Sequence, residues 1–331
     1  MKQYHVYGIG AALVDTEIEV SDAELAQMGV EKGLMTLVDE DRQHQLMKHL
    51  EGHLVYSKKA SGGSACNSII AASYFGANAY YSCKVALDDN GEFFMNDLKN
   101  AGVDAPFDTD KQPGITGKCL VMISPDAERS MNTFLGISET LSVAELNHNA
   151  IKASEYIYYE GYLVTSPTGR ASAIEAHNVA KANGVKTAIS LSDPGMVEFF
   201  KDGLQEMIGD GVDLLFCNED EAKGWAKTDD LENAIQAIKA ISKTFAITLG
   251  SKGAIVFDGT KTTKIAPHVV TAVDTNGAGD MFAGAFLYAI THGHDFVTAG
   301  KLASRAAAEV VANYGPRLPA DSHQAILREI I

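Results

Sequence analysis

Hydrophobic and polar residues alternate in several short segments of the N-terminal half. Such alternation is typical of strands that bury one face and leave the other in water. It occurs at 13–20, 118–124 and 129–135, and 33–39 is a fourth candidate. Residues 125–128, with the sequence PDAE, are suited to a hairpin turn between two of these segments. The pattern predicts a small antiparallel sheet outside the main core, built from two separate parts of the chain.

From about residue 150 the rhythm changes, and buried apolar runs alternate with helical stretches. This arrangement predicts a doubly wound, mostly parallel α/β sheet with helices on both faces. The expected strands are 4–10, 156–163, 186–192, 213–218 and 245–250, with one more given by the run GAIVFD, and the expected helices are 169–183, 231–243, 279–292 and 297–313. We expect one α/β domain over residues 1–331, with a β-sheet lid formed by segments at about 13–39 and 114–136.

Composition narrows the class of protein. The 331 residues are 46% hydrophobic, which is enough for a sizeable core. A formal charge of -16 disfavours binding to nucleic acid or to anionic membranes, although backbone amides could still hold an anion locally. The apolar runs are too short for a membrane helix or a signal peptide, and the four cysteines are scattered. We therefore expect a reduced, cytoplasmic protein.

The segment DTNGAGD, residues 274–280, is the most informative stretch of the chain. A strand-like run at 269–273 precedes it and a helix-like run at 281–290 follows it. Small residues would leave successive amides unpaired at the start of that helix, where an anion binds well. A carboxylate at Asp280 would repel a phosphate unless it removes a proton from an attacking hydroxyl. On this segment alone, an acid that merely caps the helix is the competing interpretation.

Other candidate residues follow glycines or strand ends. Gly62 and Gly63 precede a helix and would let a substrate approach the backbone, with Asn67 hydrogen-bonding a sugar hydroxyl; a tight packing joint is the alternative. Asn218 and Glu221 follow a buried strand and share one helical face, so Glu221 could order water bound to Mg2+. A simple helix cap at Asn218 is the alternative.

The remaining candidates are a turn and an acid near the first strand. Gly250 and Gly253 flank a turn after Thr248, which is either a plain hairpin or a surface for ATP phosphates or ribose. Asp15 stands just past the first strand and could accept both hydroxyls of a vicinal diol. Gly8 and Gly10 only faintly match a dinucleotide-binding fingerprint, because the third glycine position is leucine.

Taken in order, these motifs resemble the PfkB (ribokinase) family of small-molecule kinases. The family's C-terminal signature is matched by Asp274, Thr275, Gly277, Ala278, Gly279, Asp280 and Phe282, and its glycine-pair signature by Gly62, Gly63, Asn67, Ala71, Ala72 and Gly76. The Asn-x-x-Glu element is matched by Asn218 and Glu221, and the nucleotide turn by Thr248, Gly250 and Gly253. The resemblance covers nearly the whole chain, so a purely capping role for Asp280 becomes a weak alternative.

The resemblance implies a ribokinase-like fold and transfer of the ATP γ-phosphoryl group to a primary hydroxyl. It implies that Asp280 is the base and that the amides of Gly277, Ala278 and Gly279 stabilise the transferring group. By the same resemblance, Asp15, Gly62, Gly63 and Asn67 bind the substrate, Asn218, Thr248, Gly250, Gly253 and Asn313 bind ATP, and Glu221 acts on Mg2+ through water. Asp274 could contribute to a monovalent-cation site, such as one for K+.

The substrate is less well defined. GGSACNSI, at 62–69, and the long insert between Asp15 and Gly62 are similar to the adenosine-kinase branch, so a nucleoside is favoured and a sugar is the alternative. Asn276 replaces a threonine found in many members, with an open consequence for the anion loop. Arg129 could reach phosphate or substrate, or form a surface salt bridge. The sequence leaves open whether the protein is a monomer or a homodimer.

Overall fold

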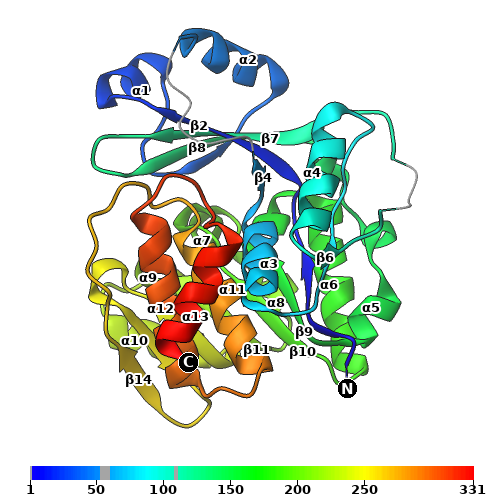
Figure 1. The fold of residues 1–331 in the computed structure, drawn as a ribbon, viewed down its shortest axis with the longest axis vertical. Helices are drawn as coiled ribbons and strands as arrows, with labels where there is room; N and C mark the ends of the chain where they lie inside the picture. The colour runs from blue at the N-terminus through cyan, green and yellow to red at the C-terminus, as the bar shows by residue number, and fades with distance from the viewer. Residues whose placement is uncertain (1, 53–59, 108–110) are drawn as a thin grey trace.

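The computed structural model describes residues 2–52, 60–107 and 111–331. A large sheet lies between two layers of helices, and a smaller sheet covers one end of it (Figure 1). The smaller sheet lies near the top of that view, with α1 (Asp22–Met28) and α2 (Glu40–His49) above it. Within the described residues, none of the helices has both the length and the apolar character needed to span a membrane.

The large sheet is parallel over most of its width. In spatial order it contains β14 (Thr262–Ile265), β13 (Ala254–Phe257), β12 (Ser242–Thr248), β11 (Val212–Asn218), β10 (Lys186–Ser190), β9 (Ser154–Glu160), β1 (Tyr4–Ile9), β5 (Ala79–Ser82) and β6 (Val103–Asp104). Among the described strands of this sheet, the pairings of β12 with β13 and of β13 with β14 are antiparallel and the others are parallel. The predicted doubly wound sheet is therefore confirmed, with an antiparallel edge.

Helices cover both faces of this sheet, because successive strand residues point to opposite sides. In β9, Tyr158 packs into the cluster under α3, α11 and α12, while Ile157 and Tyr159 pack into the cluster under α6, α8 and α10. The helices are α1 (Asp22–Met28), α2 (Glu40–His49), α3 (Ser64–Phe75), α4 (Asp89–Asn100), α5 (His148–Lys152), α6 (Pro167–Ala182), α7 (Pro194–Phe199), α8 (Lys201–Ile208), α9 (Glu219–Ala226), α10 (Leu231–Lys239), α11 (Ala278–Thr291), α12 (Phe296–Val311) and α13 (Ala320–Ile330).

The small sheet differs from the prediction in its pairing. Its order is β3 (Met35–Leu37), β8 (Arg129–Gly136), β7 (Thr116–Ile123), β2 (Leu13–Glu19) and β4 (Ala60–Gly62). The hairpin of β7 and β8 is antiparallel as predicted, but β2 pairs with β7, and β3 with β8, in parallel. The sheet is mixed because β2 and β3 reach β7 and β8 from distant parts of the chain rather than through hairpins.

The expected water-exposed face of the small sheet is also wrong. Ile18 and Met122 pack under α1 and α2, on the side away from the large sheet. On the other side Leu13, Cys119 and Val121 form a second apolar cluster. The polar residues that alternate along β2 therefore face the body of the protein instead of open water.

Three predicted elements differ in extent from the structure for local reasons. Residues 269–273 contain no strand, and Val269 is 95% exposed, because no neighbouring strand pairs with this apolar run. The helix predicted at 231–243 ends at Lys239, and β12 already begins at Ser242. Strand β9 likewise ends at Glu160, and a 3-10 turn follows where the prediction continued the strand to 163.

Candidate active site

A cavity of about 940 Å³ lies between the small sheet and the carboxyl ends of the large sheet's parallel strands. This is where open α/β sheets place their ligands. Most of the residues predicted for the site line it: Asp15, Gly63, Asn67, Asn218, Glu221, Thr248, Gly250, Gly253, Gly277, Ala278, Gly279 and Asp280. Gly62, Asp274 and Asn313 do not line it.

The loop before α11 has the geometry of an anion site. Its N-cap, Gly277, has φ 74 and carries no side chain to fill the helix end. A Cβ on Gly277 would lie 2.2 Å from the carbonyl oxygen of Pro316, so only glycine fits. Of the amides expected to be unpaired, that of Ala278 donates to the Thr275 carbonyl oxygen at 3.3 Å. The following first-turn amides, at Gly279 and Asp280, have no partner within the helix, and both residues line the cavity.

Asp280 sits in the first turn of α11 and is held by two side chains of α3. Ser64 Oγ donates to Asp280 Oδ1 at 2.6 Å, and Asn67 Nδ2 donates to Asp280 Oδ2 at 3.0 Å. Burial raises the pKa of Asp280, while these hydrogen bonds and the positive charge of Arg129 counteract part of the rise. A carboxylate with a raised pKa beside an anion site is well suited to accept a proton.

Asn67 retains an unused acceptor. Its Oδ1 is buried and has no hydrogen-bond partner within the described residues. A buried acceptor without a partner is costly, and a ligand hydroxyl would relieve that cost. Sequence reasoning selected Asn67 but missed Ser64, whose only signal was its place directly after the glycine pair.

Asp274 shapes the loop from outside the cavity. Its Oδ1 accepts from the Asn276 amide at 2.8 Å and its Oδ2 from the Gly315 amide at 3.0 Å. Burial raises its pKa and these two amides oppose the rise. These contacts show that Asp274 fixes the geometry of the loop. A monovalent cation at Asp274 stays a prediction.

Asn276 joins the anion loop to the small sheet. Its Nδ2 donates to Oε1 of Glu17 on β2 at 3.3 Å, and both residues are buried. Beside it, the Thr275 hydroxyl donates to the Ala127 carbonyl oxygen at 3.1 Å. The position where the loop departs from the common family pattern therefore contacts the neighbouring sheet.

The small sheet supplies a mostly apolar wall with one acid. Asp15 is buried on β2, where desolvation and the nearby Glu17 raise its pKa to about 7. Gly62 lies in the edge strand β4, where it pairs with Leu13 beside this wall. The apolar lining from this sheet consists of Leu13, Met35, Leu37, Cys119, Met131 and Leu135. Tyr162, in the 3-10 turn after β9, lines the cavity from the large domain.

Asn218 and Glu221 form a helix cap, and they also line the cavity, so both interpretations of their spacing are compatible with the structure. Asn218 is the N-cap of α9, and the two residues form a capping box. Glu221 also lines the cavity, and burial raises its pKa to about 8, with the charge of Asp193 contributing. The described residues contain no cluster of three or more metal-ligating side chains. Mg2+ commonly takes one or two carboxylates and completes its shell with phosphates and water, so the Glu221 carboxylate stays a predicted partner for this ion.

The turn after Thr248 is a hairpin that also forms part of the cavity wall. Strands β12 and β13 are antiparallel, and a short 3-10 turn joins them. The segment 267–270 lies in the same wall, with the exposed Val269 and Val270 in it. Asn313 lies on the surface, where its Nδ2 donates to the Glu309 carbonyl oxygen at 2.8 Å.

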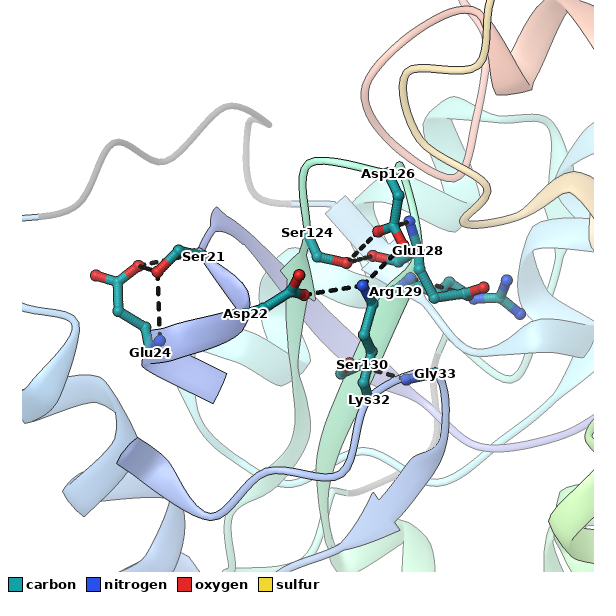
Figure 2. A network of polar contacts seen from close by, with 10 residues as sticks. All are labelled: Ser21, Asp22, Glu24, Lys32, Gly33, Ser124, Asp126, Glu128, Arg129 and Ser130. Atoms are coloured by element: carbon teal, nitrogen blue, oxygen red, sulfur yellow. Dashed lines mark hydrogen bonds and ion pairs between the residues drawn. The ribbon is translucent and has the colours of Figure 1, made fainter. Parts of the chain in front are cut away.

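Arg129 reaches the cavity, and a lysine forms the surface ion pairs nearby. Lys32 Nζ lies 2.8 Å from Asp22 Oδ1 and 2.7 Å from Asp126 Oδ2, and Figure 2 shows the Arg129 guanidinium pointing away from this network. Arg129 lines the cavity, and its Nη1 donates to the Thr275 carbonyl oxygen at 3.4 Å. Its Nε is buried with no hydrogen-bond partner among the described residues. A salt bridge of Arg129, the alternative role, is not observed among the described residues.

The comparison with known protein families decides the class of enzyme. The model of the pfkB family carbohydrate kinases matches residues 34–323. The chain belongs to the PfkB family. The family makes this protein a phosphotransferase with an alcohol acceptor and ATP as co-substrate, and the resemblance found in the sequence is confirmed.

Solved structures and curated relatives agree with this assignment. The crystal structure of adenosine kinase from Sinorhizobium meliloti is 33% identical, has a TM-score of 0.93 and covers 99% of each chain. That of a probable sugar kinase protein from Rhizobium etli CFN 42 is 31% identical, with a TM-score of 0.94 and full coverage of both chains (100%). Adenosine kinase of Saccharomyces cerevisiae is 28% identical over 95% of this chain and 96% of its own. The fold of this PfkB protein is thus ribokinase-like, as expected.

Proposed function

We propose that this protein is an ATP- and Mg2+-dependent nucleoside kinase that phosphorylates the primary hydroxyl of an adenosine-like nucleoside. The observation that carries the proposal is the position of Asp280. It lies in the first turn of α11, beside the anion loop, and two residues of the glycine-pair helix α3 hold its carboxylate. Asp280, the anion loop and the α3 segment proposed to bind substrate therefore meet at one end of the cavity.

The proposed chemistry is a direct phosphoryl transfer. Asp280 takes the proton of the acceptor hydroxyl, whose oxygen forms a bond to the γ-phosphorus while the bond to the β,γ-bridging oxygen of ATP breaks. The first-turn amides of α11 stabilise the charge on the transferring group, because they are fixed before the reaction begins. Arg129 approaches from β8 and adds positive charge at the same place.

ATP is assigned to the side of the cavity formed by α9, the β12–β13 turn and the 267–270 segment. Glu221 would hold Mg2+ through water, and the positive charge of the ion would lower the carboxyl pKa from the raised value and keep the group ionised. The ion supplies charge neutralisation between the phosphates when bound.

A nucleoside is favoured over a free sugar by the wall of the small sheet. Asp15 offers a carboxylate to a ribose diol, while Leu13, Met131 and Leu135 offer an apolar surface that suits a base and has no partner in a bare sugar. Relatives named adenosine kinase, from Saccharomyces cerevisiae and Sinorhizobium meliloti, support the same choice.

The small sheet is proposed to act as a lid. It forms one wall of the cavity and contacts the anion loop through Glu17, Ala127 and Arg129, so its movement would open or close the site. Closure would exclude water from the phosphoryl group and limit hydrolysis of ATP.

The cysteines in the described residues are buried free thiols, which supports a reducing, cytoplasmic location.

The substrate is tested by measuring ADP release with adenosine, inosine, ribose and fructose, each with Mg2+ and ATP. The proposal expects adenosine to give a kcat/KM at least about tenfold above either sugar, since burial of the base adds binding energy. A sugar kinase is the second candidate, supported by the Rhizobium etli relative. Higher kcat/KM with ribose or fructose than with both nucleosides would reject the nucleoside assignment.

A further inference from the structure

Glu160 is a buried acid that none of the sequence motifs includes. It is the last residue of β9, is 1% exposed and lines the cavity. A carboxylate in such a place is costly unless its oxygens are satisfied. The contacts that satisfy it identify what it does.

Each oxygen of Glu160 accepts a backbone amide from a different segment. Oε1 accepts from the Ala11 amide at 2.8 Å, and Oε2 accepts from the Ala65 amide at 2.7 Å. Ala65 is the second residue of α3, whose N-cap, Gly63, has no side chain to cap the helix. Glu160 therefore provides from β9 the cap that this helix lacks.

The two amides belong to the segments that carry the proposed substrate residues. Ala65 follows Ser64 and precedes Asn67, the two residues that hold the Asp280 carboxylate. Ala11 lies in the connection from β1 to β2, two residues before Leu13 and four before Asp15. The Glu160 carboxylate thus connects the helix start that holds Asp280 to the start of the small sheet.

The surroundings of Ala11 are built around this contact. Tyr81 donates its hydroxyl to the Ala11 carbonyl oxygen at 3.0 Å, so the residue is held through both its amide and its carbonyl. A Cβ on Gly10 would lie 2.6 Å from the Tyr81 hydroxyl and 2.7 Å from the Glu160 carboxylate. Gly10 only faintly matched a dinucleotide fingerprint. Glycine is needed at this position because a side chain there would clash with Glu160.

We infer that Glu160 is a positioning residue for phosphoryl transfer, whose ionised carboxylate fixes the N-terminus of α3 and the β1–β2 connection in the geometry that aligns Asp280 with the acceptor. Both oxygens must accept for this geometry to hold. A neutral carboxylic acid has a hydroxyl in place of one acceptor, which would face an amide that also donates. The inference rests on the proposed function, since it assumes that Asp280 and the α3 segment act together.

The charge on Glu160 depends on its neighbours. The titratable groups that face it are Asp280 on α11, Tyr81 on β5 and Tyr158 on its own strand. Burial raises its pKa to about 7, the two amides oppose the rise, and the charge of Asp280 adds to it. Above that pH both amides are held, and below it one of these hydrogen bonds is lost.

The test compares the variants E160Q and E155Q with the unaltered enzyme, using whichever acceptor the unaltered enzyme phosphorylates. Glu155 lies on the same strand outside the cavity and serves as the matched control. At pH 8.5 we expect kcat/KM of E160Q to be about 10- to 100-fold below that of the unaltered enzyme. The reason is that the glutamine NH2 group would face a backbone amide, so two donors oppose each other where a charge-assisted hydrogen bond stood. At pH 6 the difference should narrow to about threefold, since Glu160 is itself largely protonated there.

Hydrogen exchange gives a readout that does not depend on activity. In E160Q, and not in E155Q, peptides containing Ala11 and Ala65 should exchange faster at pH 8. The inference would be overturned if kcat/KM of E160Q stays within about twofold of that of the unaltered enzyme at pH 8.5. It would also be overturned if the ratio of the two kcat/KM values does not change with pH, or if exchange at both amides is unchanged. If no acceptor is phosphorylated, the proposed function fails, while the exchange measurement still judges the role of Glu160.

Discussion

At the scale of single residues, the site uses carboxyl groups in distinct environments. Asp280 is held by side-chain donors at a helix start, Asp15 is buried on β2 near Glu17, and Glu221 closes a capping box. Burial raises the pKa of all three, for Asp15 to about 7 and for Glu221 to about 8. The roles proposed for these carboxyl groups, which are proton transfer, diol recognition and metal binding, therefore correspond to three different surroundings.

The hydroxyl of Ser64 lowers the pKa of Asp280, so its removal should change the pH dependence of the reaction. In S64A the pKa of Asp280 rises further, and the acid limb of the profile of kcat against pH moves to higher pH. The loss relative to the unaltered enzyme should therefore be larger at pH 6 than at pH 8, by about three- to tenfold.

The control for this experiment is S73A. Ser73 lies on the same helix and donates to the Ala101 carbonyl oxygen, away from the cavity. Its profile should keep the shape of the unaltered enzyme's. An acid limb in S64A that stays in place or moves to lower pH would show that Ser64 does not tune the base.

At the scale of elements, the N-termini of α3 and α11 and the end of β9 meet at the site. The sequence predicted both helix starts, because small residues and glycines precede an apolar helical run in each case. It could not predict that Ser64 bonds Asp280, or that Glu160 bonds Ala11 across 149 residues, because such contacts depend on how distant strands are ordered. The strand predicted at 269–273 failed for the same reason: apolar residues form a strand only beside a partner.

The contact between Asn276 and Glu17 predicts how the small sheet docks on the anion loop. In N276A this buried hydrogen bond is lost, so the closed arrangement becomes less favourable. We expect the acceptor KM to rise about three- to tenfold with a smaller change in kcat, and the ratio of ADP released without acceptor to that released with it to increase.

The comparison for N276A is Y314F, which removes a more exposed contact between the Tyr314 hydroxyl and Glu19 of β2. Exposed contacts contribute little, so its kinetics should stay within about twofold of the unaltered enzyme's. A normal acceptor KM and unchanged uncoupled hydrolysis in N276A would contradict the docking role of Asn276.

At the scale of the whole molecule, two sheets enclose one cavity, and the site's acids are buried between them. Composition and periodicity predicted the layered α/β domain, because buried strands and amphipathic helices follow the hydrophobic pattern directly. The mixed pairing of the small sheet was not predictable in this way, since local alternation is the same for parallel and antiparallel neighbours. Which acids are buried was likewise visible only in the assembled fold.

These buried acids predict a fall in stability with rising pH. The pKa of Asp15 and Glu160 is raised to about 7 and that of Glu221 to about 8, whereas unfolded carboxyls are already ionised at pH 7. The folded protein therefore binds more protons than the unfolded chain, and its free energy of unfolding decreases from pH 7 to 8.5. Without ligands, Tm should fall by roughly 2–4 °C over this range.

The variant E221Q removes one of these groups, so its Tm should fall less over the same range. The exposed Glu232 on α10 gives the matched control, E232Q, which should follow the unaltered protein. A Tm that is constant or rises from pH 7 to 8.5 in the unaltered protein would show that the folded state does not retain these protons.

The most direct test of the account is the turnover of D280N with saturating adenosine, ATP and Mg2+, beside calorimetric titration of both substrates. Asparagine keeps the size of the side chain but cannot accept the proton, so kcat should fall by about 10²–10⁴-fold while both dissociation constants stay within about threefold. A kcat of D280N within about tenfold of the unaltered enzyme's would contradict the assignment of Asp280 as the base.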